Sequence, residues 1–168
     1  MNRLTILLLI PLLVASAAMA TDDWKPQKEP RAVSLGLFTL PEGLEVTTWA
    51  RTPDLYNPTN IDIDHAGRIW VAEGVNYRRH RERRPAGDRI AVLQDTNGDG
   101  TCDRSHTFVQ EKGLVAPLGV AVFDNVIYVS QPPEIIVYTD VNRDLVFDPK
   151  VDKRESLLTG FNARNHDH

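Results

Sequence analysis

The sequence predicts an all-β protein: an incomplete β-propeller of about two four-stranded blades plus a closing strand, preceded by a signal peptide. Apolar residues recur at every second position in several short segments, which is typical of strands with one buried face. Turn residues separate these segments, and the whole pattern occurs twice. Four short strands in a repeat of about 40–50 residues are typical of a propeller blade. No stretch after the N-terminal segment keeps the apolar spacing and caps of a helix over three turns.

The first twenty residues, 1–20, have the features of a signal peptide. Arg3 precedes an apolar run at 4–14, and Ala18-Met19-Ala20 forms a cleavage pattern. The alternative is a membrane anchor, which needs about 20 apolar residues, more than this run supplies. We therefore expect an exported protein, periplasmic or extracellular, with any membrane association arising from a parent protein or the export signal.

The rest of the chain has an acidic balance and a single cysteine. Removal of Arg3 leaves 19 − 1 = 18 basic residues against 23 acidic ones, a net charge of 18 − 23 = −5. This balance argues against nucleic acid as a partner. Cys102 has no second cysteine to pair with, and its acidic neighbours disfavour the thiolate, so neither an internal disulfide nor a nucleophilic role is expected.

A leader, a turn and a strand are predicted before the repeats. Residues 21–36 are polar and contain proline, which is typical of a flexible leader. Residues 37–168 are predicted to form the N-terminal part of the propeller. Within them, Pro41-Glu42-Gly43 reads as a turn, and "LEVTTWA" at 44–50 reads as a strand.

The two predicted blades span about residues 57–110 and 114–161. The following segments align: "NPTNIDIDHAGRIWVAE" (57–73) with "APLGVAVFDNVIYVSQ" (116–131), and "DRIAVLQDTNGDGTCD" (88–103) with "PEIIVYTDVNRDLVFD" (133–148). The first pair is offset by 59 residues and the second by 45, so the first copy carries an insertion around "YRRHRERRPA". A blade buries its faces only against neighbouring blades, and at least about 3 repeats are normally needed. We therefore expect a fragment that does not fold cooperatively alone.

The turn "DTNGDGTCD" is a candidate calcium site. Asp95, Asn97, Asp99 and Asp103 supply oxygens at positions 1, 3, 5 and 9, and Gly100 permits a sharp turn. Position 12 is His106 instead of a bidentate glutamate, so water and main-chain carbonyls would have to complete a shell of about 6–8 oxygens. The alternative is that the Asp and Asn side chains bond their own backbone and close the hairpin without a metal.

The second copy repeats this turn in a form less suited to calcium. Arg143 and Leu145 replace both glycines and place a cation inside the loop. The oxygen-bearing residues that correspond by the 45-residue shift are Asp140, Asn142, Asp144 and Asp148.

Two further clusters carry ionisable groups. The arginine-rich segment at 77–85 could bind a phosphate or carboxylate, or form a solvated loop. At the C-terminus, His166 and His168 flank Asp167, so these imidazoles could act as a general base or bind a metal. The alternative is an end whose partners are missing.

Several motifs together resemble a known family: "LPEGLEVTTWA", "NPTNIDIDHAGRIWVAEGVNYR", "GDRIAVLQDTNGDGTCD" and "PLGVAVFDNVIYVSQPPEIIVYTD". They resemble the N-terminal propeller of the membrane-bound dehydrogenases abundant in planctomycete-type bacteria. That group is similar in turn to the glucose/sorbosone dehydrogenases, which are six-bladed quinoprotein propellers. The resemblance covers essentially all of residues 37–168.

This resemblance implies a closing role for the strand at 44–50 and a histidine base at the propeller mouth. The base would act on a sugar or alcohol hydroxyl beside pyrroloquinoline quinone (PQQ), and His166 or His168 is the matching position. Ca²⁺ is a possible cofactor on the separate grounds of the Asp95 loop. The C-x-x-C-H motif of the haem module in related proteins does not occur in this sequence.

Two functions are therefore expected from the sequence. The first is the start of an exported quinone-dependent sugar or alcohol dehydrogenase, with this fragment itself inactive. The second is a propeller scaffold that binds carbohydrate or protein partners without redox chemistry, because a fold alone does not fix function. A nicotinamide enzyme is not expected, since no G-x-G-x-x-G motif links a strand to a helix.

Overall fold

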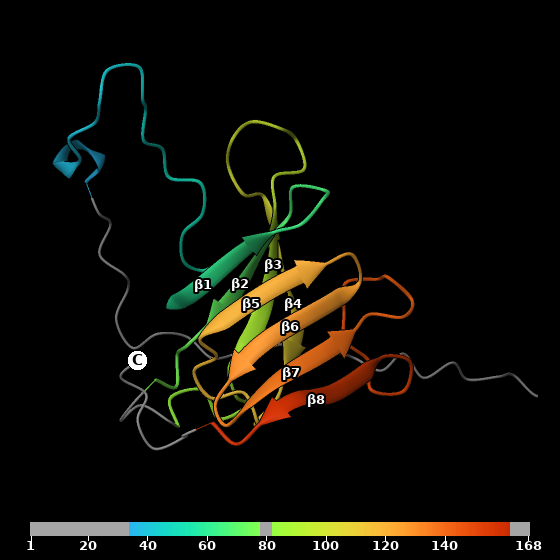
Figure 1. Ribbon diagram of the computed structural model, residues 1–168. Coiled ribbons are helices and arrows are strands. Elements are labelled where there is room, and N and C mark those ends of the chain that lie inside the picture. The colour runs from blue at the N-terminus through green and yellow to red at the C-terminus, as the bar shows by residue number, and fades with distance from the viewer. Residues whose placement is uncertain (1–33, 78–81, 162–168) are drawn as a thin grey trace, which may run out of the picture.

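The computed structural model describes residues 34–77 and 82–161, where eight strands form two separate four-stranded antiparallel sheets (Figure 1). Sheet 1 contains β1 (Pro58–Ile63), β2 (Ile69–Glu73), β3 (Arg89–Gln94) and β4 (Arg104–Gln110). Sheet 2 contains β5 (Gly119–Phe123), β6 (Val126–Gln131), β7 (Glu134–Thr139) and β8 (Lys153–Thr159). The helical content of these ranges is one 3-10 turn, η1 (Leu35–Leu37), and no helix in them is long and apolar enough to cross a bilayer.

The strand registers reproduce the internal repeat of the sequence. Cross-strand partners in β1 and β2 correspond to partners in β5 and β6, with Ile61–Val71 matching Val120–Val129 and Ile63–Ile69 matching Val122–Ile127. The prediction of an all-β chain with two four-stranded repeats is confirmed. The described sheets do not close into a ring, so the propeller stays a prediction, and the predicted signal peptide lies outside the described residues.

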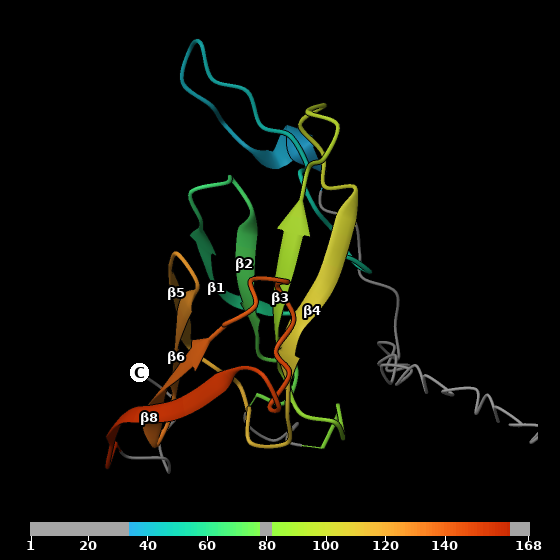
Figure 2. The same cartoon turned by 90° about the vertical axis from the view of Figure 1, so that its right-hand side faces the viewer.

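The two sheets pack head to tail. Trp70 and Val92 lie on the face of sheet 1 that meets sheet 2, whereas Val129 and Ile136 lie on the face of sheet 2 that meets sheet 1. The counterpart of Val129 in sheet 1 is Val71, which points to the opposite face of its own sheet. Each sheet therefore turns its equivalent face in the same direction, as stacked repeats do. Figure 2 shows them as two distinct layers.

Aromatic side chains fill the space between the sheets. Phe108 of β4 lies edge-on to Trp70, with 5.0 Å between ring centroids, and edge-on to Tyr138 at 6.2 Å. All three side chains are almost fully buried. Such a core between two sheets supplies most of the apolar burial that a small β domain needs.

The strands at one side of this core, β1 and β5, are joined through side chains. The backbone N–H of Val120 donates to Asn60 Oδ1 at 2.9 Å, and that of Val122 donates to Asp62 Oδ2 at 2.7 Å. The hydroxyl of Thr59 donates to the Pro117 carbonyl at 2.5 Å. Side chains of β1 thus satisfy the otherwise unpaired edge of β5 and set the relative position of the two sheets.

The far side of sheet 1, here called its outer face, is partly covered by residues 49–55. Trp49 and Leu55 pack against Val71 and Leu93, and the N–H of Cys102 donates to the Trp49 carbonyl at 2.7 Å. The predicted strand at 44–50 is not formed in this structure. A strand requires a ladder of backbone bonds, and in the described ranges the only backbone bond from this segment to a sheet region joins Trp49 to Cys102 of the β3–β4 loop.

Candidate functional site

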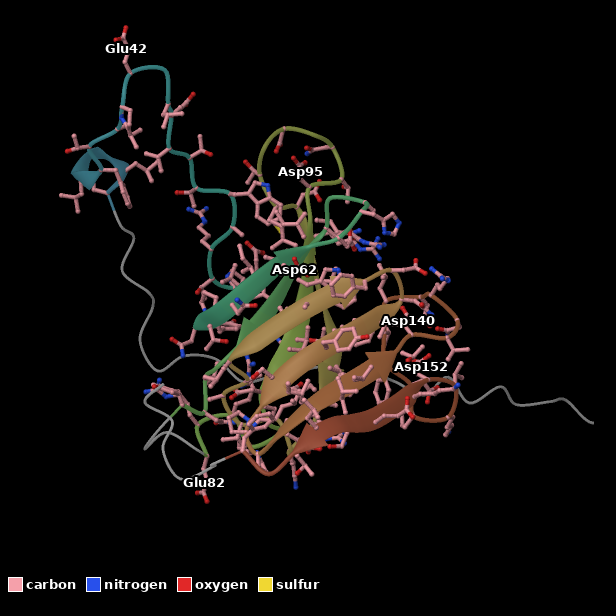
Figure 3. The ribbon with its side chains drawn as sticks, viewed as in Figure 1. Glu42, Asp62, Glu82, Asp95, Asp140 and Asp152 are labelled. Atoms are coloured by element: carbon pink, nitrogen blue, oxygen red, sulfur yellow. The ribbon has the colours of Figure 1, made fainter. Side chains whose placement is uncertain are left out.

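The predicted calcium ligands lie in the loop that joins β3 to β4, at the end of sheet 1 opposite Glu82 (Figure 3). Asp95 accepts from the N–H of Gly98 at 2.7 Å with Oδ1 and from that of Gly100 at 2.8 Å with Oδ2. Asn97 Oδ1 accepts from the N–H of Asp99 at 2.9 Å. Gly98 and Gly100 have φ of 75° and 84°, so the backbone can wrap around the Asp95 carboxylate.

The last predicted ligand, Asp103, closes the base of the loop. It accepts from the N–H of Thr96 at 3.1 Å and from the Thr96 hydroxyl at 2.8 Å, and these bonds lower the pKa of its carboxyl. Across residues 34–77 and 82–161 no three acidic, histidine or cysteine side chains form a group that could hold a metal. The observed bonds are those of the metal-free turn, and calcium in this loop stays a prediction.

The loop between β7 and β8 repeats the same geometry. Asp140 accepts from the N–H of Arg143 at 2.7 Å with Oδ1 and from that of Leu145 at 2.9 Å with Oδ2. These donors lie 45 residues after Gly98 and Gly100, as the sequence repeat predicts. Arg143 and Leu145 adopt φ of 62° and 67°, the left-handed conformation that favours glycine.

The counterpart of Asp103 is Asp152 and not Asp148, which corrects the sequence alignment. Asp152 Oδ1 accepts from the N–H of Val141 at 2.8 Å, as Asp103 accepts from the N–H of Thr96. The shift of 45 residues at the start of the loop becomes 49 at its end, because the second loop is four residues longer before its last strand. Asp148 Oδ1 instead accepts from the N–H of Lys150 within those extra residues.

Charged residues near this loop line a small cavity of about 200 Å³ between the sheets. The guanidinium of Arg143 contacts Asp124 at 2.5 Å, and that of Arg68 contacts Asp64 at 2.6 Å. Asp64 also accepts from the indole N–H of Trp70 at 2.9 Å, which ties this ion pair to the core. These bonds hold the turns of the two sheets and pair the charged groups of Arg143 with Asp124 and of Arg68 with Asp64.

His106, which would occupy position 12 of a calcium loop, lies in β4 and points between the sheets. Its Nε2 is 3.1 Å from the Leu145 carbonyl, and its Nδ1 is buried without a hydrogen-bonding partner in the described chain. A carbonyl only accepts, so Nε2 carries the proton and Nδ1 is bare. Burial lowers the pKa of this imidazole, and the charges of Arg104 and Arg68 lower it further. His106 is therefore a neutral structural link to the second loop.

At the other end of sheet 1, Glu73 forms a buried ionic cluster. Its carboxylate contacts Arg84 Nη1 at 2.7 Å and Arg89 Nε at 2.8 Å, and it accepts from the N–H of Tyr56 at 2.9 Å. Arg84 belongs to the arginine-rich segment 77–85, so in this structure it anchors the β2–β3 connection to the sheet. Sequence reasoning missed Glu73 as its partner, although a glutamate at the end of an apolar strand was a usable signal.

A second buried carboxylate, Asp88, connects the two sheets at this end. It accepts from the N–H of Ala116 at 2.7 Å and from the N–H of Asn76 at 3.2 Å. Burial raises the pKa of Asp88. Sequence reasoning assigned no role to Asp88, which fixes the connection between β4 and β5.

The predicted catalytic histidines, His166 and His168, lie outside the described residues. The last described residues, Gly160 and Phe161, lie at the β6–β7 turn, because their N–H groups both donate to the Pro133 carbonyl, at 3.0 and 3.1 Å. The catalytic role of His166 and His168 stays a prediction.

Comparison with known proteins identifies a family. A family model described as "Domain of unknown function (DUF7133)" matches residues 30–168. The chain belongs to this family. No curated protein matches the DUF7133 chain.

Two solved structures of one fungal protein are loosely similar to the DUF7133 chain. They are titled "Iodide structure" and "Calcium structure of Trichoderma reesei Carbohydrate-Active Enzymes Family AA12". Both have a TM-score of 0.44 and 22% identity, over 62% and 63% of this chain. The chain spans about a quarter of their length, 24% in each case. A TM-score this low is insufficient to assign a shared fold.

Proposed function

We propose that this DUF7133 chain supplies two adjoining blades of a β-propeller, at the start of an exported quinone-dependent sugar or alcohol dehydrogenase. The observation that carries the architectural part is the head-to-tail packing of the two sheets. Packing of this kind leaves one further apolar face at each end of the stack, the one on sheet 1 partly covered by residues 49–55, and further blades would pack at these ends. The dehydrogenase part is supported by the resemblance of the motifs quoted above.

In the proposed reaction, the imidazole of His166 or His168 takes the proton of a substrate hydroxyl. PQQ, when bound, would accept the hydride. The buried guanidiniums of Arg84 and Arg89 are already bonded to Glu73, so these two groups do not fit the quinone. The residues proposed to hold the quinone are therefore other than these two.

A non-catalytic scaffold for carbohydrate or protein partners is the second candidate. The observation that favours it is the use of the ionisable groups for structure. Asp95 and Asp140 bind loop amides, His106 binds a carbonyl, and Glu73 binds two arginines, one of them Arg84.

The two candidates are separated by assaying the native protein, purified from its source with an antibody against this chain. After addition of PQQ and Ca²⁺, the dehydrogenase should reduce an artificial dye with aldoses or simple alcohols. His166→Ala or His168→Ala should abolish that reduction while quinone uptake persists, whereas Asn165→Ala is the matched control. Absence of quinone uptake would overturn the dehydrogenase and leave the scaffold.

Calcium is tested on the same preparation by isothermal titration. A site in the first loop would lose its heat signal in Asp99→Asn and keep it in Asp144→Asn, the corresponding change in the second loop. An unchanged signal in both variants would place any calcium elsewhere.

A further inference from the structure

The loop between β3 and β4 contains the only Asn-Gly pair of the sequence, at residues 97–98. Both residues are exposed, and a Cβ added to Gly98 would meet no atom within 4 Å. Glycine leaves its backbone nitrogen unshielded, because it has no side chain. An asparagine that precedes such a nitrogen can react with its own main chain, so this pair is a candidate site of covalent modification.

The reaction at this pair would need no partner other than water. The nitrogen of Gly98 loses its proton to water or hydroxide and attacks Cγ of Asn97, which forms a new C–N bond. The bond from Cγ to Nδ2 breaks, and Nδ2 leaves as ammonia after taking up a proton from water. Water then opens the resulting succinimide ring, either at Cγ to give aspartate or at the main-chain carbonyl to give isoaspartate. The net change replaces the side-chain amide with an acid.

Hydrogen bonds hold both reacting groups of this pair in the folded loop. The N–H of Gly98 donates to Asp95 Oδ1 at 2.7 Å. The side chain of Asn97 is held at both of its polar atoms, because Oδ1 accepts from the N–H of Asp99 at 2.9 Å and Nδ2 donates to Asp99 Oδ2 at 3.1 Å. The attack requires a deprotonated nitrogen aligned with Cγ, so these bonds must break first. The reaction therefore starts from a locally opened loop.

The loop between β7 and β8 holds its asparagine in the same way but lacks the glycine. The N–H of Arg143 donates to Asp140 Oδ1 at 2.7 Å, the same distance as in the first loop. Arg143 follows Asn142 directly, so a side chain stands beside the nitrogen that would attack. The guanidinium of Arg143 also contacts Asp124 at 2.5 Å, which restrains this residue. The second loop is an internal reference in which the same bonds occur without an unshielded nitrogen.

We propose that Asn97 deamidates spontaneously, and that the carboxylate of Asp95 sets the rate by holding the N–H of Gly98. When opening and closing are fast, the rate of such a reaction follows the fraction of open loop. The converted fraction therefore records how long the loop has been open. Conversion adds a carboxylate to the loop, and the isoaspartate product also lengthens the main chain by a methylene group before Gly98. The proposal goes beyond the proposed function and depends on neither its quinone nor its further blades.

The test incubates the full chain at neutral pH in water enriched with heavy oxygen, followed by digestion with trypsin and mass spectrometry. Cleavage after Arg89 and Arg104 releases the peptide 90–104, in which Asn97 is the only asparagine. This peptide should gain heavy oxygen and separate into aspartate and isoaspartate forms. Asn142 in the same digest should remain an amide. A synthetic peptide of residues 90–104 has no folded loop, so it should convert faster than the full chain.

Asp95→Ala should raise the rate at Asn97 in the full chain about fivefold, because a lost hydrogen bond of ordinary net strength increases the open fraction by about that factor. The same change in the synthetic peptide is the matched control and should have no effect. Asp95→Asn keeps a carbonyl acceptor, so its rate should lie between those of the wild type and Asp95→Ala. Gly98→Arg, which copies the second loop, should stop the reaction. Fluorescence of the buried Trp70 shows whether each variant keeps its core.

Four results would overturn the proposal. They are a full chain that converts as fast as the synthetic peptide, Asp95 variants with a core that react no faster than the wild type, Gly98→Arg that still converts, and an Asn142 that converts as fast as Asn97. A slower reaction in Asp95→Ala would mean that the carboxylate assists the attack instead of restraining it. Failure of quinone binding would leave all of these results unaffected, so this proposal and the proposed function fail separately.

Discussion

The two Asp-rich loops have the same backbone geometry although their sequences favour it to different degrees. In the first, Gly98 and Gly100 adopt left-handed conformations at little cost. In the second, Arg143 and Leu145 adopt them, and a non-glycine residue in that conformation costs about 1–2 kcal/mol. What both loops share is an aspartate that accepts from the backbone N–H groups. The carboxylate therefore determines the turn, and the glycines only make it easier to form.

Replacement of this aspartate should have the largest effect, and a larger one in the second loop. Asp140 is 2% exposed, so water has little access to the N–H groups of Arg143 and Leu145 in Asp140→Ala. We expect a loss of about 3 kcal/mol there, because buried donors without acceptors each cost about 1–3 kcal/mol. Asp95→Ala in the more exposed first loop should cost about 1 kcal/mol, since water can replace the carboxylate.

The measurement is urea unfolding followed by tryptophan fluorescence, together with amide hydrogen exchange at residues 98–100 and 143–145. Exchange gives a local comparison even where the unfolding transition is broad. Equal losses in the two loops would show that burial of the aspartate does not determine its contribution.

A glycine substitution tests how much the glycines of the first loop contribute to its stability. Gly100→Ala should cost about 1 kcal/mol, because φ is 84° and an added Cβ meets no atom within 4 Å, which leaves backbone strain as the main term. Gly113→Ala is the control, since its added Cβ has only an ordinary contact, 3.5 Å from Glu111 Oε1. Its effect should stay within about 0.5 kcal/mol. A loss for Gly100→Ala as small as that of the control would show that the first loop has no need of glycine.

The same comparison shows what the sequence could and could not predict. Alternating apolar residues and the repeat predicted both sheets and the pairing of Ile61 with Val71, because side-chain period and burial are local properties. The correspondence of Asp103 with Asp152 was missed, since Asp148 also fits a constant shift and only the bond to Val141 separates the two. The predicted strand at 44–50 does not form in this structure, because an alternating pattern does not supply a partner edge and the closing role would pair this segment with a later blade.

The partners in the buried ionic contacts were beyond sequence reasoning for a related reason, although Glu73 itself stood out at the end of an apolar strand. Glu73 meets Arg84 and Arg89 only after β2 and β3 pair and the intervening connection folds back. The bond from His106 to the Leu145 carbonyl likewise spans 39 residues and two sheets. Such contacts depend on tertiary packing, which residue type and spacing along the chain do not encode directly.

The smallest expected effect concerns His106, which links β4 to the second loop. Its pKa in the folded state is below the ordinary value of about 6.5 that it has when unfolded. The unfolded chain therefore binds more protons as the pH falls through that value, and the folded state loses stability from about pH 6.5 down to the lower folded pKa.

His106→Gln keeps an N–H donor for the Leu145 carbonyl and has no titration in this range. The free energy of unfolding of the wild type, minus that of His106→Gln, should decrease from pH 8 to pH 5. His65→Gln, at an exposed turn of sheet 1, controls for the loss of an imidazole. A difference that stays constant or increases toward pH 5 would mean that the buried Nδ1 gains a partner when it is protonated, and that the link between the loops changes with it.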